Sequence, residues 1–166
     1  MQFRSLSDWL SWQESLNPAE IELGLDRVSA VSAKLPLTPP PGAVFIVAGT
    51  NGKGSCAAIL EAILRAAGLK VGVYSSPHLV RYNERIRVDG KESEDADLVA
   101  AFEKIEIARD GIPLTFFEFG TLAALDIFSR QDCAAWILEV GLGGRLDAVN
   151  IVEPDFSIIT TCLLYT

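Results

Sequence analysis

Short apolar runs alternate with longer segments of helical periodicity along most of the chain. The apolar runs cover residues 44–48, 71–74, 134–140 and 156–161, and their length and composition are typical of strands buried on both faces. Helical segments are predicted between them at residues 55–67, 93–109 and 117–130. This order predicts an α/β fold with a mostly parallel sheet flanked by helices.

The first part of the chain has a different pattern. Residues 5–35 predict two helices, the second with Asn17 as its cap, Pro18 at its first position and Glu20 three residues after the cap. Its inward face is predicted from the helical spacing of Ile21, Leu25, Val28 and Val31. The segment PLTPPPG then forms a stiff connector. We therefore expect a helical arm with its connector at 1–41 and a sheet domain at 42–166, both parts of one domain.

A glycine-rich loop follows the first apolar run, in the sequence VFIVAGTNGKGS at 44–55. A strand, a glycine loop and a helix opening at Ser55 are the context of a phosphate-binding loop, in which backbone N–H groups and the helix N-terminus bind phosphate oxygens. Lys53 would reach the β and γ phosphates of ATP, and the Ser55 hydroxyl would bind Mg²⁺. The predicted ATP-binding residues are Gly49, Thr50, Asn51, Gly52, Lys53, Gly54 and Ser55.

The spacing of this loop departs from the pattern G-x-x-x-x-G-K-[ST], because Gly54 separates Lys53 from the hydroxyl residue. The alternative is a tight glycine turn that only joins a strand to a helix. Such a turn needs one or two glycines and no lysine, so the nucleotide interpretation is favoured.

A second group of polar residues lies in ILEVGLGGRLDAVN at 137–150. Glu139 comes at the end of an apolar strand, and ligands of parallel sheets gather at the carboxyl ends of the strands. Glu139 and the loop after Ala48 are therefore expected to face one crevice, where the carboxylate could hold Mg²⁺ against the phosphates. The alternative is a solvated acid at a strand end.

Composition and charge narrow the function further. The chain has 166 residues and a formal net charge of −8, which argues against general nucleic-acid binding. It has no apolar run that could span a membrane and no secretory signal, so we expect a cytoplasmic protein. Three widely spaced cysteines, Cys56, Cys133 and Cys162, predict reduced, buried thiols rather than a disulfide framework or a zinc site.

Two further features stay open. His78 is the only histidine of the chain, and we expect it to shape its loop or to contact a phosphate rather than to act as an acid or base. Arg81, Arg85 and Arg87 could steer an anionic substrate, or could belong to one solvated face of a strand.

These motifs, together with YSSPHLVRYNERIRV and TFFEFGTLAAL, make the chain resemble the Mur ligase superfamily and, within it, the folylpolyglutamate synthase and dihydrofolate synthase family. The segment IELGLDRVSAV is most similar to the bifunctional bacterial members. The resemblance implies that Lys53 and Glu139 are catalytic and that Ser55, Ser76 and Glu139 hold Mg²⁺. It implies a dihydropteroate site made of Glu22, Leu23, Gly24, Leu25, Thr115, Phe116, Phe117, Glu118, Leu146, Asp147 and Ala148.

In that site, Phe117 would stack on the pterin and Asp147 would accept its N–H groups. The implied reaction is ATP-dependent: a carboxylate of pteroate or folate attacks the γ-phosphate, and the amine of L-glutamate displaces phosphate from the acyl phosphate. Lys53 and Mg²⁺ would neutralise the charge that develops during phosphoryl transfer. The implied partners are ATP, L-glutamate and dihydropteroate or folate, with a monomeric protein.

The resemblance also concerns the end of the chain. Family members continue with a histidine metal ligand, a carbamylated lysine and a C-terminal domain, whereas this chain ends in CLLYT, which we expect to be non-native. The resemblance thus implies an incomplete P-loop domain without its C-terminal partner, inactive alone. The alternatives are a small-molecule kinase, a peptidoglycan-precursor ligase of the same superfamily, and a nucleotide-binding module without catalysis.

Overall fold

The computed structural model describes residues 3, 5–16 and 23–163 of the chain. In this part the chain forms one sheet with the strand order β4-β3-β2-β5-β1-β6. Strands β2, β5, β1 and β6 are parallel, while β3 and β4 run antiparallel at the edge beside β2. The strands are β1 (Ala43–Ala48), β2 (Val71–Tyr74), β3 (Ile86–Val88), β4 (Lys91–Glu92), β5 (Ala135–Glu139) and β6 (Phe156–Ile159).

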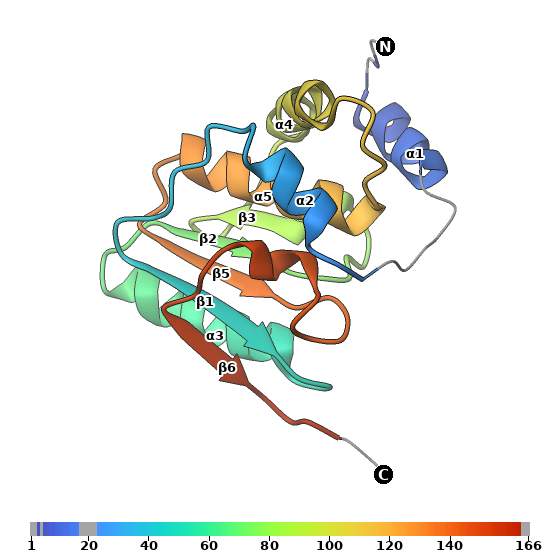
Figure 1. Ribbon diagram of the computed structural model, residues 1–166. Helices are drawn as coiled ribbons and strands as arrows, with labels where there is room; N and C mark the ends of the chain where they lie inside the picture. The colour runs from blue at the N-terminus through green and yellow to red at the C-terminus, as the bar shows by residue number, and fades with distance from the viewer. Residues whose placement is uncertain (1–2, 4, 17–22, 164–166) are drawn as a thin grey trace.

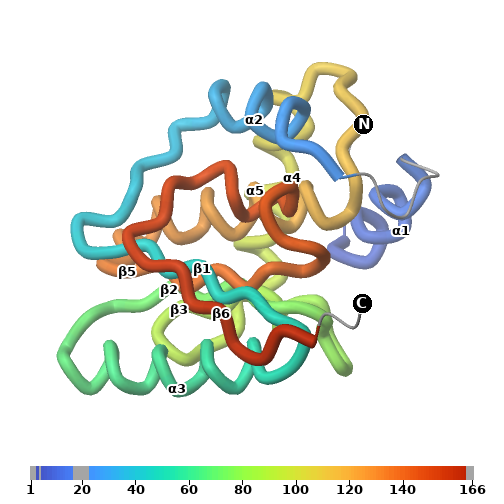
Figure 2. Tube along the Cα trace, turned by 60° about the horizontal axis from the view of Figure 1, so that its bottom comes forward, coloured from blue at the N-terminus to red at the C-terminus, as the bar shows by residue number. Residues whose placement is uncertain are grey.

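Helices cover both faces of the sheet. Figure 1 shows α3 on one face and α5, with α2 and α4, on the other, and Figure 2 shows the same two layers from a second direction. The described helices are α1 (Leu6–Leu16), α2 (Asp26–Ser32), α3 (Lys53–Ala66), α4 (Asp95–Arg109) and α5 (Phe116–Arg130), with short 3₁₀ helices η1 (Tyr82–Arg85) and η2 (Ala148–Ile151).

The core lies in two layers because the central strands are buried on both faces. On one side, Val47, Val73 and Ile137 pack against Ala57 of α3. On the other side, a larger cluster joins the sheet to α5, which is buried along almost its whole length from Glu118 to Phe128. This burial fixes α5 firmly beside the strand ends that carry the polar loops.

The parallel strands and the three main helices confirm the predicted α/β fold. Three details of the prediction are wrong. Helix α3 begins at Lys53 rather than Ser55, so the lysine belongs to its first turn. Strand β6 is not buried on both faces, because it lies at the sheet edge with Phe156 and Ile159 exposed. The thiols are free, but only Cys133 is buried, while Cys56 is half-buried and Cys162 is exposed.

The predicted second helix of the arm begins later than expected within the described chain. Helix α2 starts at Asp26 and buries Val28 and Val31 as predicted. The expected cap and first turn, with Glu22 of the predicted site, lie outside the described residues: Asn17, Pro18, Glu20, Ile21 and Glu22.

The helical arm contacts the rest of the molecule through aromatic side chains. Trp9 of α1 is 1% exposed, and its ring centroid lies 5.9 Å from that of Phe102 on α4. Trp12 packs edge-on against Phe119 of α5, with centroids 5.9 Å apart. Helix α1 therefore shares the large core cluster with α4 and α5.

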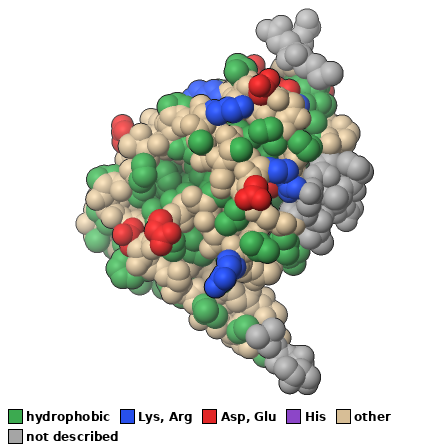
Figure 3. Space-filling view, in the orientation of Figure 1, with side chains coloured by type: hydrophobic (Ala, Val, Ile, Leu, Met, Phe, Trp, Pro, Cys, Tyr) green, Lys and Arg blue, Asp and Glu red, His purple; other side chains and the backbone are tan. Residues whose placement is uncertain are grey.

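The molecular surface carries hydrophobic side chains among its charges. On the face drawn in Figure 3, acidic and basic side chains of the described residues are dispersed, with hydrophobic groups between them. In the part of the chain that the structure describes, a helix both long enough and apolar enough to cross a bilayer is not found.

Candidate functional site

Three loops meet at the carboxyl edge of the sheet. They follow β1, β2 and β5, which are parallel neighbours in the order β2-β5-β1. Val47 of β1 is in register with Glu139 of β5, and the Val140 N–H donates to the Val47 carbonyl oxygen at 3.0 Å. The glycine loop and the Glu139 loop therefore begin side by side, as the crevice prediction requires.

The glycine loop is held in place from the β6 side. Gly49 has φ 137°, and a Cβ atom there would lie 2.1 Å from Thr160 Oγ1. This hydroxyl lies 3.1 and 2.8 Å from the carbonyl oxygens of Ala48 and Asn51, and its single proton can be donated to either. The Thr50 N–H donates to the Thr161 carbonyl oxygen at 2.7 Å. Only glycine at position 49 allows this close approach.

Helix α3 begins directly after this loop. Gly52 adopts the left-handed conformation with φ 84° and precedes the first helical residue, Lys53. The first N–H groups of an α-helix have no partner within the helix, so the loop and the first turn present donors suited to an anion. Thr50, Asn51, Gly54 and Ser55 are exposed at this end of the helix.

The Lys53 side chain folds back over the loop. Its Nζ donates a hydrogen bond to the Gly49 carbonyl oxygen at 2.9 Å, and the side chain lines a cavity that extends toward α5. The ammonium group thus lies between the loop and the cavity.

Glu139 is buried at the carboxyl end of β5, which contradicts its interpretation as a solvated acid. Its Oε2 accepts the Ser76 N–H at 3.2 Å and lies 3.9 Å from the position that a Cβ atom of Gly54 would occupy. Burial raises the pKa of this carboxyl, while the Ser76 amide, Lys53 and Arg87 act in the opposite direction. The acid, the serine loop and the glycine loop therefore meet at one point.

These groups are suitable ligands for a hard divalent cation. Glu139 supplies a carboxylate, and Ser55 and Ser76 supply hydroxyls, all oxygen donors of the kind that Mg²⁺ and Mn²⁺ prefer. No group of three or more acidic, histidine or cysteine side chains forms a metal cage within the described residues. A cation here would fit the pattern in which one carboxylate is completed by phosphate oxygens and water.

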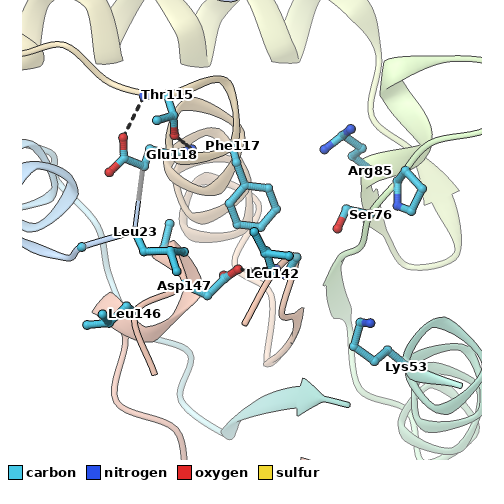
Figure 4. Close-up of a pocket in the computed structure, with 14 residues that line it drawn as sticks. Leu23, Lys53, Ser76, Arg85, Thr115, Phe117, Glu118, Leu142, Leu146 and Asp147 are labelled. Carbon is cyan, nitrogen blue, oxygen red and sulfur yellow. Dashed lines mark hydrogen bonds between the residues drawn. The ribbon is translucent and has the colours of Figure 1, made fainter. Parts of the chain in front are cut away.

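A cavity of ≈ 340 Å³ extends from Lys53 to α5. This volume is typical of small-molecule sites. Figure 4 shows Phe117 projecting into it between Asp147 and Leu142 on one side and Ser76 and Arg85 on the other. The lining residues are Leu23, Gly24, Lys53, Ser76, Pro77, Arg85, Thr115, Phe117, Glu118, Gly141, Leu142, Leu146, Asp147 and Ala148.

Among the described members of the predicted dihydropteroate set, most line this cavity and two do not. Phe116 instead packs against Tyr82, with ring centroids 5.5 Å apart, and Leu25 lies half-buried at the start of α2. Gly141 and Leu142 line the cavity but were not selected from the sequence. Both residues lie in the loop after β5, a few positions before the predicted Asp147, and this position in the sequence could have indicated them.

Asp147 organises the loop that carries it. Its Oδ2 accepts the N–H groups of Gly141 and Leu142 at 3.0 and 2.9 Å, and its Oδ1 accepts the Val149 N–H at 3.2 Å. Burial raises the pKa of this carboxyl, and the three amides counteract that effect. A carboxylate has about four acceptor positions, so capacity remains for a ligand N–H in the cavity.

Thr115 and Glu118 form the N-terminal cap of α5. Thr115 Oγ1 accepts the Glu118 N–H at 3.2 Å, and Glu118 Oε2 accepts the Thr115 N–H at 2.7 Å. The other oxygen of Glu118 accepts from Arg27 at 3.1 Å. This cap joins α2 to α5 at the cavity wall.

His78 and the arginines near it have different surroundings. The Nδ1 atom of His78 accepts a hydrogen bond from Arg85 Nε at 2.7 Å, and burial together with Arg85 lowers the pKa of the imidazole. Arg87 pairs with the buried Glu61 at 2.9 Å, and the exposed Arg81 pairs with Glu92 at 3.2 Å. Of the three arginines, only Arg85 lines the cavity.

Known sequences similar to this chain are synthases of folate metabolism. A dihydrofolate synthase/folylpolyglutamate synthase of Escherichia coli (strain K12) is 55% identical over 96% of this chain and 38% of its own length. The protein of the same name from Haemophilus influenzae is 49% identical over 94% of this chain and 36% of its own length. The chain therefore spans less than two fifths of the curated relatives that it matches. No family model matches the sequence.

Solved structures give the same result. E. coli FolC in complex with DHPP and ADP superposes with a TM-score of 0.94 at 55% identity, covering 98% of this chain and 39% of that one. A bifunctional folylpolyglutamate synthase/dihydrofolate synthase with Mn, AMPPNP and L-glutamate bound superposes with a TM-score of 0.88 at 54% sequence identity. This match covers 94% of this chain and 38% of that one. On this sequence identity and shared fold, the chain belongs to the folylpolyglutamate synthase/dihydrofolate synthase family.

Proposed function

We propose that the chain provides the nucleotide-binding and pteroate-binding part of an ATP-dependent ligase that joins L-glutamate to dihydropteroate and to tetrahydrofolate. The observation that carries the proposal is the convergence of three features at one sheet edge. The glycine loop, Glu139 and a lined cavity of ≈ 340 Å³ all lie there. The relatives described above bear the names of folate synthases, which supports this substrate class.

ATP would bind at the glycine loop and the first turn of α3. Donors for its phosphates would come from the backbone of 51–55, and the Lys53 ammonium can turn from the Gly49 carbonyl oxygen to a phosphate oxygen. Ser55, Ser76 and Glu139 would hold Mg²⁺, which when bound supplies positive charge against the phosphate oxygens.

The pteroate would occupy the cavity. Phe117 offers an aromatic face and Asp147 offers a carboxylate at the end beside α5, while Lys53 lies at the end beside the glycine loop. A ligand with an aromatic bicyclic head and a carboxylate tail would thus place its acid end toward the phosphates. Proximity of the two reactants is the main requirement of the first step.

The proposed reaction has two steps. A carboxylate oxygen of the pteroate or folate forms a bond to the γ-phosphorus while the bond to the ADP oxygen breaks, which gives an acyl phosphate and ADP. The amine of L-glutamate then bonds to the acyl carbon, and phosphate leaves with release of a proton. Lys53 and Glu139 would be catalytic in the first step, since the charge on the transferred group must be stabilised.

A polypeptide of these 166 residues is expected to bind both ligands but to show little ligase turnover. The polypeptide spans 38% of the length of the E. coli relative. Appreciable formation of dihydrofolate from ATP, dihydropteroate and L-glutamate by the isolated polypeptide would contradict this part of the proposal.

The phosphate loop is tested by replacing its lysine. Lys53→Ala should weaken Mg-ATP binding tenfold or more in calorimetric titration, because a hydrogen bond to a charged group contributes about 1.5–3 kcal/mol. Lys91→Ala is the matched control, since Lys91 is an exposed lysine on β4 at the far edge of the sheet. Equal nucleotide affinity in the Lys53 variant and the wild type would show that the loop does not bind phosphate.

A further inference from the structure

Arg85 differs from the other buried or half-buried arginines of the described residues, Arg27, Arg87 and Arg109, each of which pairs with an acid. It is half-buried in the cavity wall, yet it forms no ion pair with any carboxylate in the described part of the chain. Other arginines do pair with acids: Arg65 with Asp89, Arg81 with Glu92, Arg87 with Glu61, Arg109 with Glu106 and Arg130 with Asp126.

Neutral groups hold Arg85 in position. Its Nε donates to His78 Nδ1 at 2.7 Å, and its guanidinium carbon lies 5.6 Å from the Tyr82 ring centroid and 5.4 Å from that of Phe116. Figure 4 shows the Arg85 side chain beside Ser76, on the opposite side of the cavity from Phe117, with its guanidinium directed toward Phe117. The side chain is therefore oriented toward the cavity by contacts that leave its charge uncompensated.

The carboxylates that line the cavity, Asp147 and Glu118, form no ion pair with Arg85 and hydrogen-bond to other donors instead. Asp147 accepts three backbone amides. Glu118 accepts from the Thr115 amide and from Arg27. A cation removed from water in this way is stabilised by an anion, and an anionic ligand group is the natural partner.

We propose that Arg85 binds the carboxylate of the acid that the ligase activates, with His78 as the residue that positions the guanidinium. The inference rests on the proposed function and deepens it, since it assigns the acid group of the pteroate to a place between Phe117 and Lys53. The planar guanidinium can hold a carboxylate through parallel N–H donors. This orients the acid for attack on the γ-phosphorus. The packing of Phe116 under Arg85 also accounts for its absence from the cavity wall.

The test compares two ligands of the same shape. Dihydropteroate and its carboxamide are titrated against the 166-residue chain and against Arg85→Met, with Arg81→Met as the matched control at an exposed arginine. The wild type and the control should prefer the carboxylate by roughly tenfold or more, given the strength of charge-assisted hydrogen bonds. Arg85→Met should lose that preference and keep its affinity for the carboxamide and for Mg-ATP.

Other results of this titration have defined meanings. An unchanged preference for the carboxylate in Arg85→Met would overturn the proposal. An equal loss of affinity for dihydropteroate and for its carboxamide, in a variant that still binds Mg-ATP, would overturn it as well. If Arg85→Met does not fold, Arg85→Lys serves instead, and it should show a reduced preference because a lysine lacks the parallel donors. Wild-type chain that binds Mg-ATP but neither pteroate ligand would refute the proposed function itself.

The role of His78 is tested by the same ratio of affinities. His78→Ala should reduce the preference for the carboxylate roughly two- to tenfold, the range expected for the loss of one hydrogen bond. His78→Gln should keep most of the preference, because the amide oxygen can accept from Arg85 Nε. Equal behaviour of the two variants would show that His78 does not position Arg85.

Discussion

At Gly141 the chain passes so close to the cavity wall that a Cβ atom would lie 2.6 Å from Cε2 of Phe117. The glycine thus allows the loop after β5 to contact the edge of the ring. Phe117 and Asp147, whose carboxylate accepts the Gly141 N–H at 3.0 Å, are thereby held at the same end of the cavity. The shape of the proposed pteroate site depends on a residue that contributes no side chain.

A methyl group at this position should therefore disturb one ligand and spare the other. Gly141→Ala is expected to displace the Phe117 ring and to weaken dihydropteroate binding about tenfold, since overpacking costs about 1–3 kcal/mol. Mg-ATP binding should change less than twofold. Gly144→Ala is the control, because a Cβ atom there would meet no heavy atom within 4 Å. Equal effects on both ligands, measured by parallel titrations, would contradict this explanation.

Single residues could be predicted from the sequence where a motif fixes their neighbours. The glycine loop predicted the place of Lys53, and the strand-end position of Glu139 predicted its nearness to that loop. The roles of Arg85 and His78 could not be predicted in the same way. They depend on a contact between a loop and a 3₁₀ helix and on the rings of Tyr82 and Phe116, which no local pattern encodes.

Helix α5 lies between the sheet and α4, and its N-terminus forms part of the cavity wall. Its first turn is closed by the reciprocal hydrogen bonds of Thr115 and Glu118. Because Glu118 also accepts from Arg27, this cap connects α2 to the cavity wall. The cap therefore contributes to stability and to the geometry of the site together.

Removal of the cap hydroxyl should be measurable as a loss of stability. Thr115→Ala is expected to lower the free energy of unfolding by about 1 kcal/mol, because one N–H of the first turn loses its acceptor. Thr115→Ser keeps the hydroxyl and should remain within about 0.5 kcal/mol of the wild type. Urea denaturation followed by circular dichroism measures both. A serine variant as unstable as the alanine variant would exclude the cap as the cause.

Elements with a strong period were predictable, and those shaped by their surroundings were not. The apolar runs of β1, β2 and β5 and the helical patterns of α3, α4 and α5 give elements close to the expected bounds. The short antiparallel strands β3 and β4 have no such run. Strand β6 has an apolar composition, but its exposure follows from its place at the sheet edge, which composition does not reveal.

For the molecule as a whole, the helical arm is joined to the sheet domain by an aromatic cluster. Trp9 lies within 6 Å of three other aromatic rings, with centroid distances of 4.9 Å to Phe3, 5.4 Å to Trp12 and 5.9 Å to Phe102. The Arg109 guanidinium lies 5.2 Å from the Trp12 ring centroid. We propose that arm and sheet unfold as one cooperative unit, in agreement with the single domain expected from the sequence.

Replacement of Trp9 by alanine tests whether the arm and the sheet unfold cooperatively. Trp9→Ala should destabilise the entire chain by about 3–5 kcal/mol, the usual cost of removing a large buried aromatic side chain. Thermal unfolding should remain a single transition at a lower temperature. Ile107→Ala is the control, since Ile107 is 80% exposed on α4. Two separate transitions, or an unchanged midpoint with loss of helical signal alone, would show that the arm is an independent unit.

The attachment of the glycine loop to β6 links two properties that are otherwise remote. Thr160 and Thr161 fasten the outermost strand to the backbone that would receive the polyphosphate. If the loop binds a nucleotide as proposed, loosening this strand would lower the nucleotide affinity. By thermodynamic reciprocity, a bound nucleotide would stabilise the attachment of the strand by the same factor. The edge of the sheet and the proposed phosphate site would then be coupled in one equilibrium.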